Sequence, residues 1–301
     1  MNLKDVNILS KLKPSTRFLI KRILQSTSRL LGIRLLGNPY IADKLFPQAG
    51  GKNGFVINDS TYKIDGYDEY GLAFPSPLYT HGHPDKGWFW ESGKEDVDNM
   101  INILVDSGID LTILGHVLDF GCASGRLIRH LYKHKDTEIW GCDISAEHIG
   151  WCKEYLSPPF NFITNTTSPH LPFEDGYFSF IYAGSVFTHI DDLADMWFLE
   201  LKRILQKGGV LYITIHDDST LDIFKEIKRK DKFASAVINS KEYSEYERSN
   251  GKMFVIGRSV YSQVFYNTEY LSRILKDNFE LLSVTPKAYR DIQTAYLLRN
   301  S

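Results

Sequence analysis

Asp119 and Asp143 are the two side chains whose type and spacing indicate a bound ligand most clearly. Asp119 closes an apolar run and leads into the glycine-rich turn of residues 121–125. Between a strand and a helix, such a turn cradles a small molecule with backbone N–H groups. The spacing Gly121-x-x-x-Gly125 differs from the G-x-G-x-x-G fingerprint of dinucleotide-binding turns. Because a carboxylate repels a pyrophosphate, Asp119 favours instead a ligand that carries a primary ammonium and a sulfonium.

Asp143 closes a second apolar run, and a predicted helix from Arg126 to about Lys135 separates the two runs. An acid at the end of the second strand of a βαβ unit can accept hydrogen bonds from both hydroxyls of a ribose. Ser145 is expected to cap the next helix, with Glu147 in its first turn. The two acids therefore predict a site for a ligand with an ammonium group and a ribose.

His189 and His216 are the candidates for removing a proton from a second substrate. His189 follows the predicted strand 178–184, and His216 ends the predicted strand 210–216. Residues at these strand ends face the edge of the sheet where ligands bind, and imidazole titrates near neutral pH. Each histidine is expected either to act as a general base or to have a structural role.

The elements that must position these residues alternate between strands and helices. This alternation predicts an α/β fold with a doubly wound, Rossmann-like sheet. The expected strands are 115–120, 137–142, 160–164, 178–184, 210–216, 279–285 and 294–298, and the expected helices are 92–107, 145–155, 191–205 and one that starts near Asn267.

With these segments in place, the chain resembles the class I S-adenosylmethionine-dependent methyltransferases, including bacterial enzymes that act on small molecules and glycans. The resemblance rests on residues 119–125, Asp143, 171–182 and 205–214, which follow the order and spacing of the family. It implies a seven-stranded, mostly parallel sheet with an antiparallel last strand. It also implies S-adenosyl-L-methionine as the methyl donor, S-adenosyl-L-homocysteine as the product, and no metal.

The resemblance also implies roles for the residues after the first strand. Asp119 would order water and the loop around the ammonium group of the donor. The backbone of the turn would approach the methionine portion of the donor, which favours residues without a bulky Cβ atom. The turn residues implied to bind the donor are Gly121, Cys122, Ala123 and Gly125.

The resemblance also implies donor contacts by residues at the ends of the other strands. Asp143 would bind the ribose hydroxyls, and Ile144 would pack on the adenine. The family often has an acid or amide after the third strand for the adenine amino group. This chain has no acid there, and the contact falls to Asn165 or Thr166. Ser185 would face the methionine end of the donor.

The domain organisation predicted from the sequence has two parts. Residues 1–95 form an N-terminal extension, and residues 96–301 form the methyltransferase domain with a lid-like insertion at 217–262. Within the extension, residues 17–36 have helical apolar spacing interrupted by basic residues. This segment either packs on its own domain or contacts an anionic membrane surface.

The composition is that of a globular protein and does not favour nucleic-acid binding. The apolar content of 43% allows a sizeable core, and the net charge of −2 gives no general field for nucleic acid, which is not expected as a partner. Three cysteines, at 122, 142 and 152, have no metal-binding spacing and fit a reduced, cytoplasmic protein, which could be peripheral to the inner face of the membrane.

The sequence thus favours O-methylation of a small molecule, sugar or glycan precursor by in-line methyl transfer. The alternative is a catalytically inactive methyltransferase-fold binding or partner subunit. A nicotinamide-dependent oxidoreductase is disfavoured, because the G-x-G-x-x-G fingerprint is missing.

Overall fold

The computed structural model describes residues 64–76, 85–110, 115–134, 137–191, 193–257 and 262–301. The chain divides into two compact units, 1–42 and 43–301, and every described residue belongs to the second unit. The basic segment 17–36 therefore lies outside the described residues. Within those described ranges, no helix is long and apolar enough to cross a membrane.

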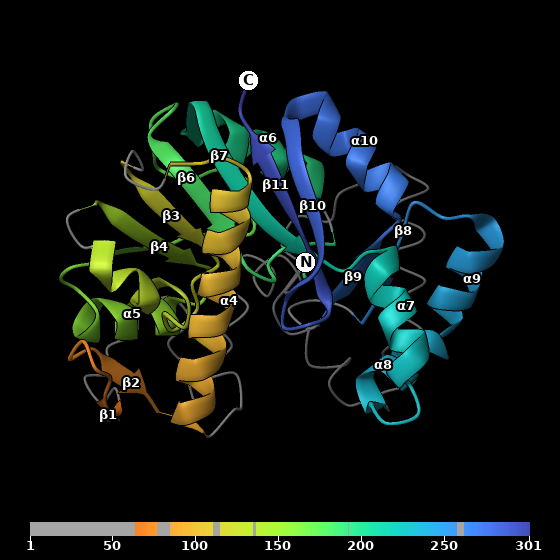
Figure 1. Cartoon of the computed structure of the whole chain (residues 1–301), viewed down its shortest axis with the longest axis horizontal. Helices are drawn as coiled ribbons and strands as arrows, with labels where there is room; N and C mark the ends of the chain where they lie inside the picture. The colour runs from red at the N-terminus through yellow and green to blue at the C-terminus, as the bar shows by residue number, and fades with distance from the viewer. Residues whose placement is uncertain (1–63, 77–84, 111–114, 135–136, 192, 258–261) are drawn as a thin grey trace, which may run out of the picture. The chain divides into compact units, whose positions relative to one another are not determined.

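Seven strands form one sheet in the order β10-β11-β7-β6-β3-β4-β5 (Figure 1). Strands β7, β6, β3, β4 and β5 run parallel, whereas β11 is antiparallel to both of its neighbours. The predicted doubly wound α/β class with an antiparallel last strand is therefore confirmed. The strands are β3 (Val117–Phe120), β4 (Ile139–Asp143), β5 (Asn161–Thr164), β6 (Phe178–Ala183), β7 (Leu205–Ile215), β10 (Glu280–Tyr289) and β11 (Gln293–Arg299).

Helices cover both faces of the sheet, and each face has its own hydrophobic core. Helix α4 (Lys86–Asp106), the 3-10 helix η3 (Ile128–His134) and α5 (Ala146–Tyr155) cover one face. Helices α6 (Ala194–Ile204) and α10 (Thr268–Asn278) cover the other. Side chains alternate along a strand, so β3 directs Val117 to the α4 face and Leu118 to the α6 face. The same alternation turns Asp119 toward the core beneath α4.

The predicted insertion forms a cap of three helices, α7 (Asp218–Ile227), α8 (Lys232–Ile238) and α9 (Lys241–Ser249). Strand β8 (Met253–Ile256) follows and pairs with β9 (Gln263–Tyr266). Figure 1 shows the three helices grouped together at one side of the sheet. The aromatic residues of the cap pack on one another in a separate hydrophobic cluster, in which the Phe254 and Phe265 rings stack 4.8 Å apart.

Two helices start at other residues than predicted, each for a local reason, and a third is of another type. Helix α4 starts at Lys86 rather than near Ser92, because the Asp85 side chain caps it by accepting a hydrogen bond from Gly87 N. Helix α6 starts at Ala194 rather than Asp191, because Leu193 has a left-handed backbone with φ of 63°. The segment after the glycine-rich turn is a 3-10 helix rather than an α-helix over 126–135.

A buried arginine explains the 3-10 geometry and fixes the glycine-rich turn. Arg129 is completely buried, and its Nε donates to the Gly125 carbonyl, the acceptor that an α-helix would use for the Arg129 N–H. Its Nη1 pairs with Asp68 Oδ2 at 3.0 Å, and its Nη2 donates to the Ala73 carbonyl. Asp68 and Ala73 belong to a hairpin of β1 (Ile64–Tyr67) and β2 (Ala73–Pro75), so Arg129 joins this hairpin to the turn.

Candidate active site

The candidate site lies where the order of the strands reverses. From this point β3 continues to β4 and β5 on one side, and β6 continues to β7 on the other. Ligands of open α/β sheets bind outside the carboxyl ends of the strands at such a switch point. The loops that follow β3 and β6 are therefore two walls of the site. They carry the predicted residues of the glycine-rich turn and Ser185.

Asp119 brings a buried carboxyl group to this switch point. The residue is 1% exposed, and its Oδ2 atom has no hydrogen-bond partner among the described residues. Burial is the main cause that raises the pKa of Asp119 to about 8, and the nearby Asp143 adds to the increase. The Tyr182 hydroxyl and Arg126 oppose it. A carboxylate in this position gains most from a ligand that brings a positive charge.

Close packing fixes the backbone of the glycine-rich turn. Gly121 has a φ of 86°, and a Cβ atom there would lie 2.3 Å from Val186 Cγ2 in the loop after β6. The Cys142 carbonyl accepts hydrogen bonds from the N–H groups of both Gly121 and Cys122. Gly121 is therefore required by contact between the two loops at the switch point, in addition to any approach of a ligand.

Asp143 joins the glycine-rich turn to the end of β4. Its Oδ2 accepts a hydrogen bond from Ala123 N at 2.9 Å, and its Oδ1 accepts one from Ser145 N at 2.8 Å. Ser145 also caps α5, as predicted, by accepting from His148 N. Each carboxylate oxygen has a second lone pair, so Asp143 can hold the turn and still accept hydrogen bonds from a ligand.

The amide predicted to face the adenine is close to Asp143. Asn165 N donates to the Asp143 carbonyl at 3.0 Å, and Asn165 is 7% exposed. Its Nδ2 donates to the Thr166 carbonyl, whereas its Oδ1 has no hydrogen-bond partner in the described part of the chain. This buried oxygen is an acceptor available to an amino group. Ile144, at the end of β4, is half-buried.

Ser185 belongs to a hydrogen-bonded network that the sequence did not indicate. Ser185 N donates to Thr214 Oγ1, and Ser185 Oγ accepts from Gln293 Nε2 at 2.8 Å. Thr214 Oγ1 in turn donates to Gln293 Oε1 at 2.7 Å. Gln293 begins β11, whose antiparallel direction places its first residue at the carboxyl ends of β6 and β7. The pairing of β11 with β7 brings this glutamine to the candidate site.

The two predicted histidines have different surroundings. His189 is exposed, and its Nδ1 lies 2.8 Å from the Ser262 carbonyl. His216 is 3% exposed and stacks on Phe265, with 4.8 Å between the ring centroids. Burial, helped by repulsion from His189, lowers the pKa of His216 to about 3. His216 is therefore neutral at pH 7 but a weak proton acceptor.

The end of β10 contributes a further residue that sequence spacing did not reveal. A Cβ atom on Gly184, which follows β6, would lie 3.0 Å from Tyr289 Cε2. Tyr289 therefore extends over the end of β6, where its hydroxyl oxygen accepts a hydrogen bond from Arg126 Nη2 at 2.5 Å. Arg126 directly follows the glycine-rich turn, so this pair spans the switch point.

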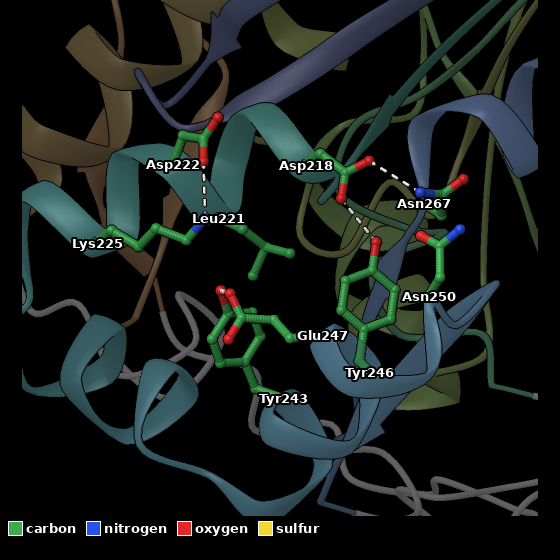
Figure 2. A pocket seen from close by; sticks show the side chains of 9 residues that line it. All are labelled: Asp218, Leu221, Asp222, Lys225, Tyr243, Tyr246, Glu247, Asn250 and Asn267. Atoms are coloured by element: carbon green, nitrogen blue, oxygen red, sulfur yellow. Dashed lines mark hydrogen bonds and ion pairs between the residues drawn. The ribbon is translucent and has the colours of Figure 1, made fainter.

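The cap contains a separate hollow of about 200 Å³ between α7 and α9 (Figure 2). Tyr246 donates to Asp218 Oδ1 at 2.6 Å, and Asn267 Nδ2 donates to Asp218 Oδ2 at 3.3 Å. Lys225 pairs with Asp222 at 2.9 Å. The polar groups around the hollow thus bond to one another, and Asp218 connects α7 to α9 and to the start of α10.

Metal binding has no candidate in the described ranges. No group of three or more His, Cys, Asp or Glu side chains there could hold a metal ion. The three cysteines are free and buried, and burial raises the pKa of the Cys122 and Cys142 thiols well above their usual value.

The buried carboxyl of Asp119 predicts a specific pH dependence of stability. An aspartate in the unfolded chain has a pKa of about 3.9, so unfolding releases a proton between pH 4 and 8. Stability should fall as pH rises through this window, with a slope of up to about 1.4 kcal/mol per pH unit. The Asp119→Asn variant should lose this slope and be more stable than wild type at pH 7. Chemical denaturation across pH 4.5–7.5 measures both quantities.

The matched control is Glu154→Gln, which removes one exposed carboxylate from α5. It should keep the wild-type slope. Parallel stability profiles for wild type and Asp119→Asn would contradict the burial account of Asp119.

Comparison with known proteins agrees with this geometry. Residues 118–213 match the family described as "Methyltransferase domain". A 117-residue stretch is 28% identical to sterol 24-C-methyltransferase ERG6B of Gibberella zeae, covering 35% of this chain and 30% of that protein. The chain thus spans less than one third of the length of this curated relative.

A solved structure with a TM-score above 0.5 shares the fold. The PH0226 protein of Pyrococcus horikoshii OT3 has a TM-score of 0.52 at 20% identity, covering 78% of this chain and 100% of that one. An S-adenosylmethionine-dependent methyltransferase of Clostridium acetobutylicum ATCC 824 has a TM-score of 0.47 at 14% identity, covering 69% and 92%. Residues 118–213 thus match a methyltransferase domain family, and the strand order agrees with a Rossmann-like methyltransferase fold.

Proposed function

We propose that this protein transfers a methyl group from S-adenosyl-L-methionine to an oxygen atom of a small molecule, sugar or glycan precursor. The observation that carries the proposal is the buried Asp119 carboxyl, with one oxygen lacking a partner at the switch point. When bound, the donor supplies an electrophilic methyl group on a positively charged sulfur. The protein residues then have to orient donor and acceptor and exclude water.

Three residues fit the parts of the donor. Asp119 Oδ2 suits the ammonium group, because that atom is buried and lacks a hydrogen-bond donor among the described residues. Asp143 suits the ribose hydroxyls through its remaining lone pairs. Asn165 Oδ1 suits the adenine amino group. The proposed contacts of Cys122, Ala123, Gly125, Ile144, Thr166 and Ser185 follow from their positions on the same loops.

His189 is the better of the two histidines for the role of general base. Its Nδ1 lies close to the Ser262 carbonyl, which favours the tautomer with the proton on Nδ1 and a lone pair on Nε2. In the proposed step, Nε2 takes the proton of the acceptor hydroxyl as the oxygen attacks the methyl carbon. The electron pair of the broken carbon–sulfur bond stays on sulfur, so the product is a neutral thioether.

The proposed setting is the cytoplasm, with an acceptor that is a small molecule or glycan precursor. Contact of residues 17–36 with the inner face of a membrane is proposed from the sequence alone, because this segment lies outside the described residues. Sedimentation with anionic vesicles, for the full chain and a variant without residues 1–36, tests this contact. Equal sedimentation of the two would contradict it.

Binding of S-adenosyl-L-homocysteine tests the donor site before any acceptor is known. Calorimetric titration should give a micromolar dissociation constant for the wild type. The Asp143→Asn variant should bind at least tenfold more weakly, about 1.4 kcal/mol, because one carboxylate acceptor of the ribose hydroxyls becomes an N–H donor. Glu154→Gln should bind like the wild type, and thermal unfolding should show that both variants are folded.

The absence of binding by the folded wild-type protein would contradict the proposal. It would favour the inactive partner subunit as the alternative.

Turnover separates the two histidines once an acceptor is found. His189→Gln should reduce kcat by 10²-fold or more, the effect typical of a lost general base, and should remove the fall of kcat at low pH that protonation of a general base causes. His216→Gln should change kcat less, because its low pKa makes His216 a weak base. A larger loss of kcat in His216→Gln than in His189→Gln would reverse the assignment.

A further inference from the structure

We propose that Arg126, Tyr289 and Arg290 form a subsite for an oxyanion, a carboxylate or phosphate, carried by the methyl acceptor. The subsite lies at the carboxyl ends of the central strands, on the side of the site formed by the β10–β11 hairpin. This inference rests on the proposed function. It specifies that the methyl acceptor carries a negatively charged group.

The topology of the hairpin brings these residues to the switch point. Strand β10 runs parallel to β7, so its last residue, Tyr289, lies at the edge of the sheet where the parallel strands end. Tyr289 pairs with Gln293 across the hairpin, and Gln293 bonds Ser185 at the end of β6. The hairpin is thus attached to the site by both of its strands.

The Arg126–Tyr289 pair presents hydrogen-bond donors. Arg126 Nη2 donates to the phenolic oxygen, so the O–H group of Tyr289 keeps its own proton for another acceptor. Burial raises the pKa of Tyr289, which keeps this proton in place at neutral pH. Arg126 Nη1 contacts Ser92 and Asp96. Its side chain is 16% exposed and so within reach of a ligand.

The local charge is positive. Asp96 is almost fully buried, pairs with Arg126 at 2.7 Å and accepts a hydrogen bond from Arg290 N at 3.1 Å. The Arg290 guanidinium lies 4.3 Å from the centre of the Trp88 ring, and no acid of the described residues forms an ion pair with it. If Asp119 is reserved for the ammonium group of the donor, Asp96 is the carboxylate that both arginines share, through the Arg126 guanidinium and the Arg290 backbone N–H. An added oxyanion would balance the excess charge.

The turn of the hairpin fixes the positions of Tyr289 and Arg290. Lys287, Arg290 and Asp291 all have positive φ angles, of 58°, 53° and 58°. Positive φ at the two central residues, Arg290 and Asp291, is the usual geometry of a tight hairpin turn, and Ile292 N donates to the Tyr289 carbonyl at 3.2 Å across it. The Ile292 carbonyl accepts from Thr220 Oγ1 at 2.7 Å, and Asp96 accepts from Arg290 N, so both contacts hold this turn against neighbouring elements.

The test uses the protein saturated with S-adenosyl-L-homocysteine and two pairs of probes. Benzoate is compared with benzamide, and glucuronate with glucuronamide, by saturation-transfer NMR titration. Benzoate, glucuronate or both should bind. The dissociation constant of an acid that binds should be at least tenfold lower than that of its amide. Tyr289→Phe, which keeps the ring, should weaken binding of the acid at least threefold, and Arg290→Ala at least tenfold. Lys287→Ala, which removes a charge from the same hairpin, should have no effect.

A second titration distinguishes the acceptor oxyanion from the carboxylate of the donor itself. Tyr289→Phe and Arg290→Ala should bind S-adenosyl-L-methionine and its decarboxylated analogue with wild-type affinities. Loss of affinity for the first compound alone would assign the subsite to the donor and overturn the proposal. Equal binding of acids and amides, or no binding of any acid, would also overturn it. Failure to bind S-adenosyl-L-homocysteine would instead contradict the proposed function.

Discussion

A carboxyl group buried without a full set of partners is the constraint around which this site is organised. Side chains alternate along β3, and this alternation directs the Asp119 carboxyl into the core beneath α4, at the switch point of the sheet. Its burial raises its pKa to about 8 and leaves Oδ2 without a hydrogen bond in the described structure. Asp119 is therefore mostly protonated at neutral pH, and a cationic ligand would stabilise its carboxylate form.

The loops around Asp119 hold one another in place. Val186 packs where a Cβ atom of residue 121 would be, and Asp143 bonds the backbone of Ala123. Arg129 donates a hydrogen bond to the Gly125 carbonyl and connects the turn to the β1–β2 hairpin through its ion pair with Asp68. Each contact joins segments that are distant in sequence, so the geometry of the turn depends on the complete sheet. This preorganisation suits a reaction in which the protein mainly orients two substrates.

The sequence was sufficient for the features that depend on local patterns. The seven strand segments, the antiparallel last strand, the Ser145 cap, the helix start near Asn267, and the positions of Asp119 and Asp143 at strand ends follow from periodicity, turn chemistry and family motifs. Features that depend on tertiary contacts were missed. Tyr289 and Gln293 reach the site only because β10 and β11 end and begin at its edge, and the 3-10 geometry of η3 depends on the side chain of Arg129. The low pKa of His216 likewise comes from Phe265 and the cap, which pack around it.

The most direct test of the central claim is the number of protons released when S-adenosyl-L-homocysteine binds. Calorimetry at pH 6.5 in two buffers of different ionisation enthalpy gives this number. If the ammonium group of the ligand meets the Asp119 carboxyl, the pKa of Asp119 falls on binding, and nearly one proton should be released per ligand bound. The Asp119→Asn variant should release none. Binding without proton release by the wild type, or equal release by the variant, would contradict the role assigned to Asp119.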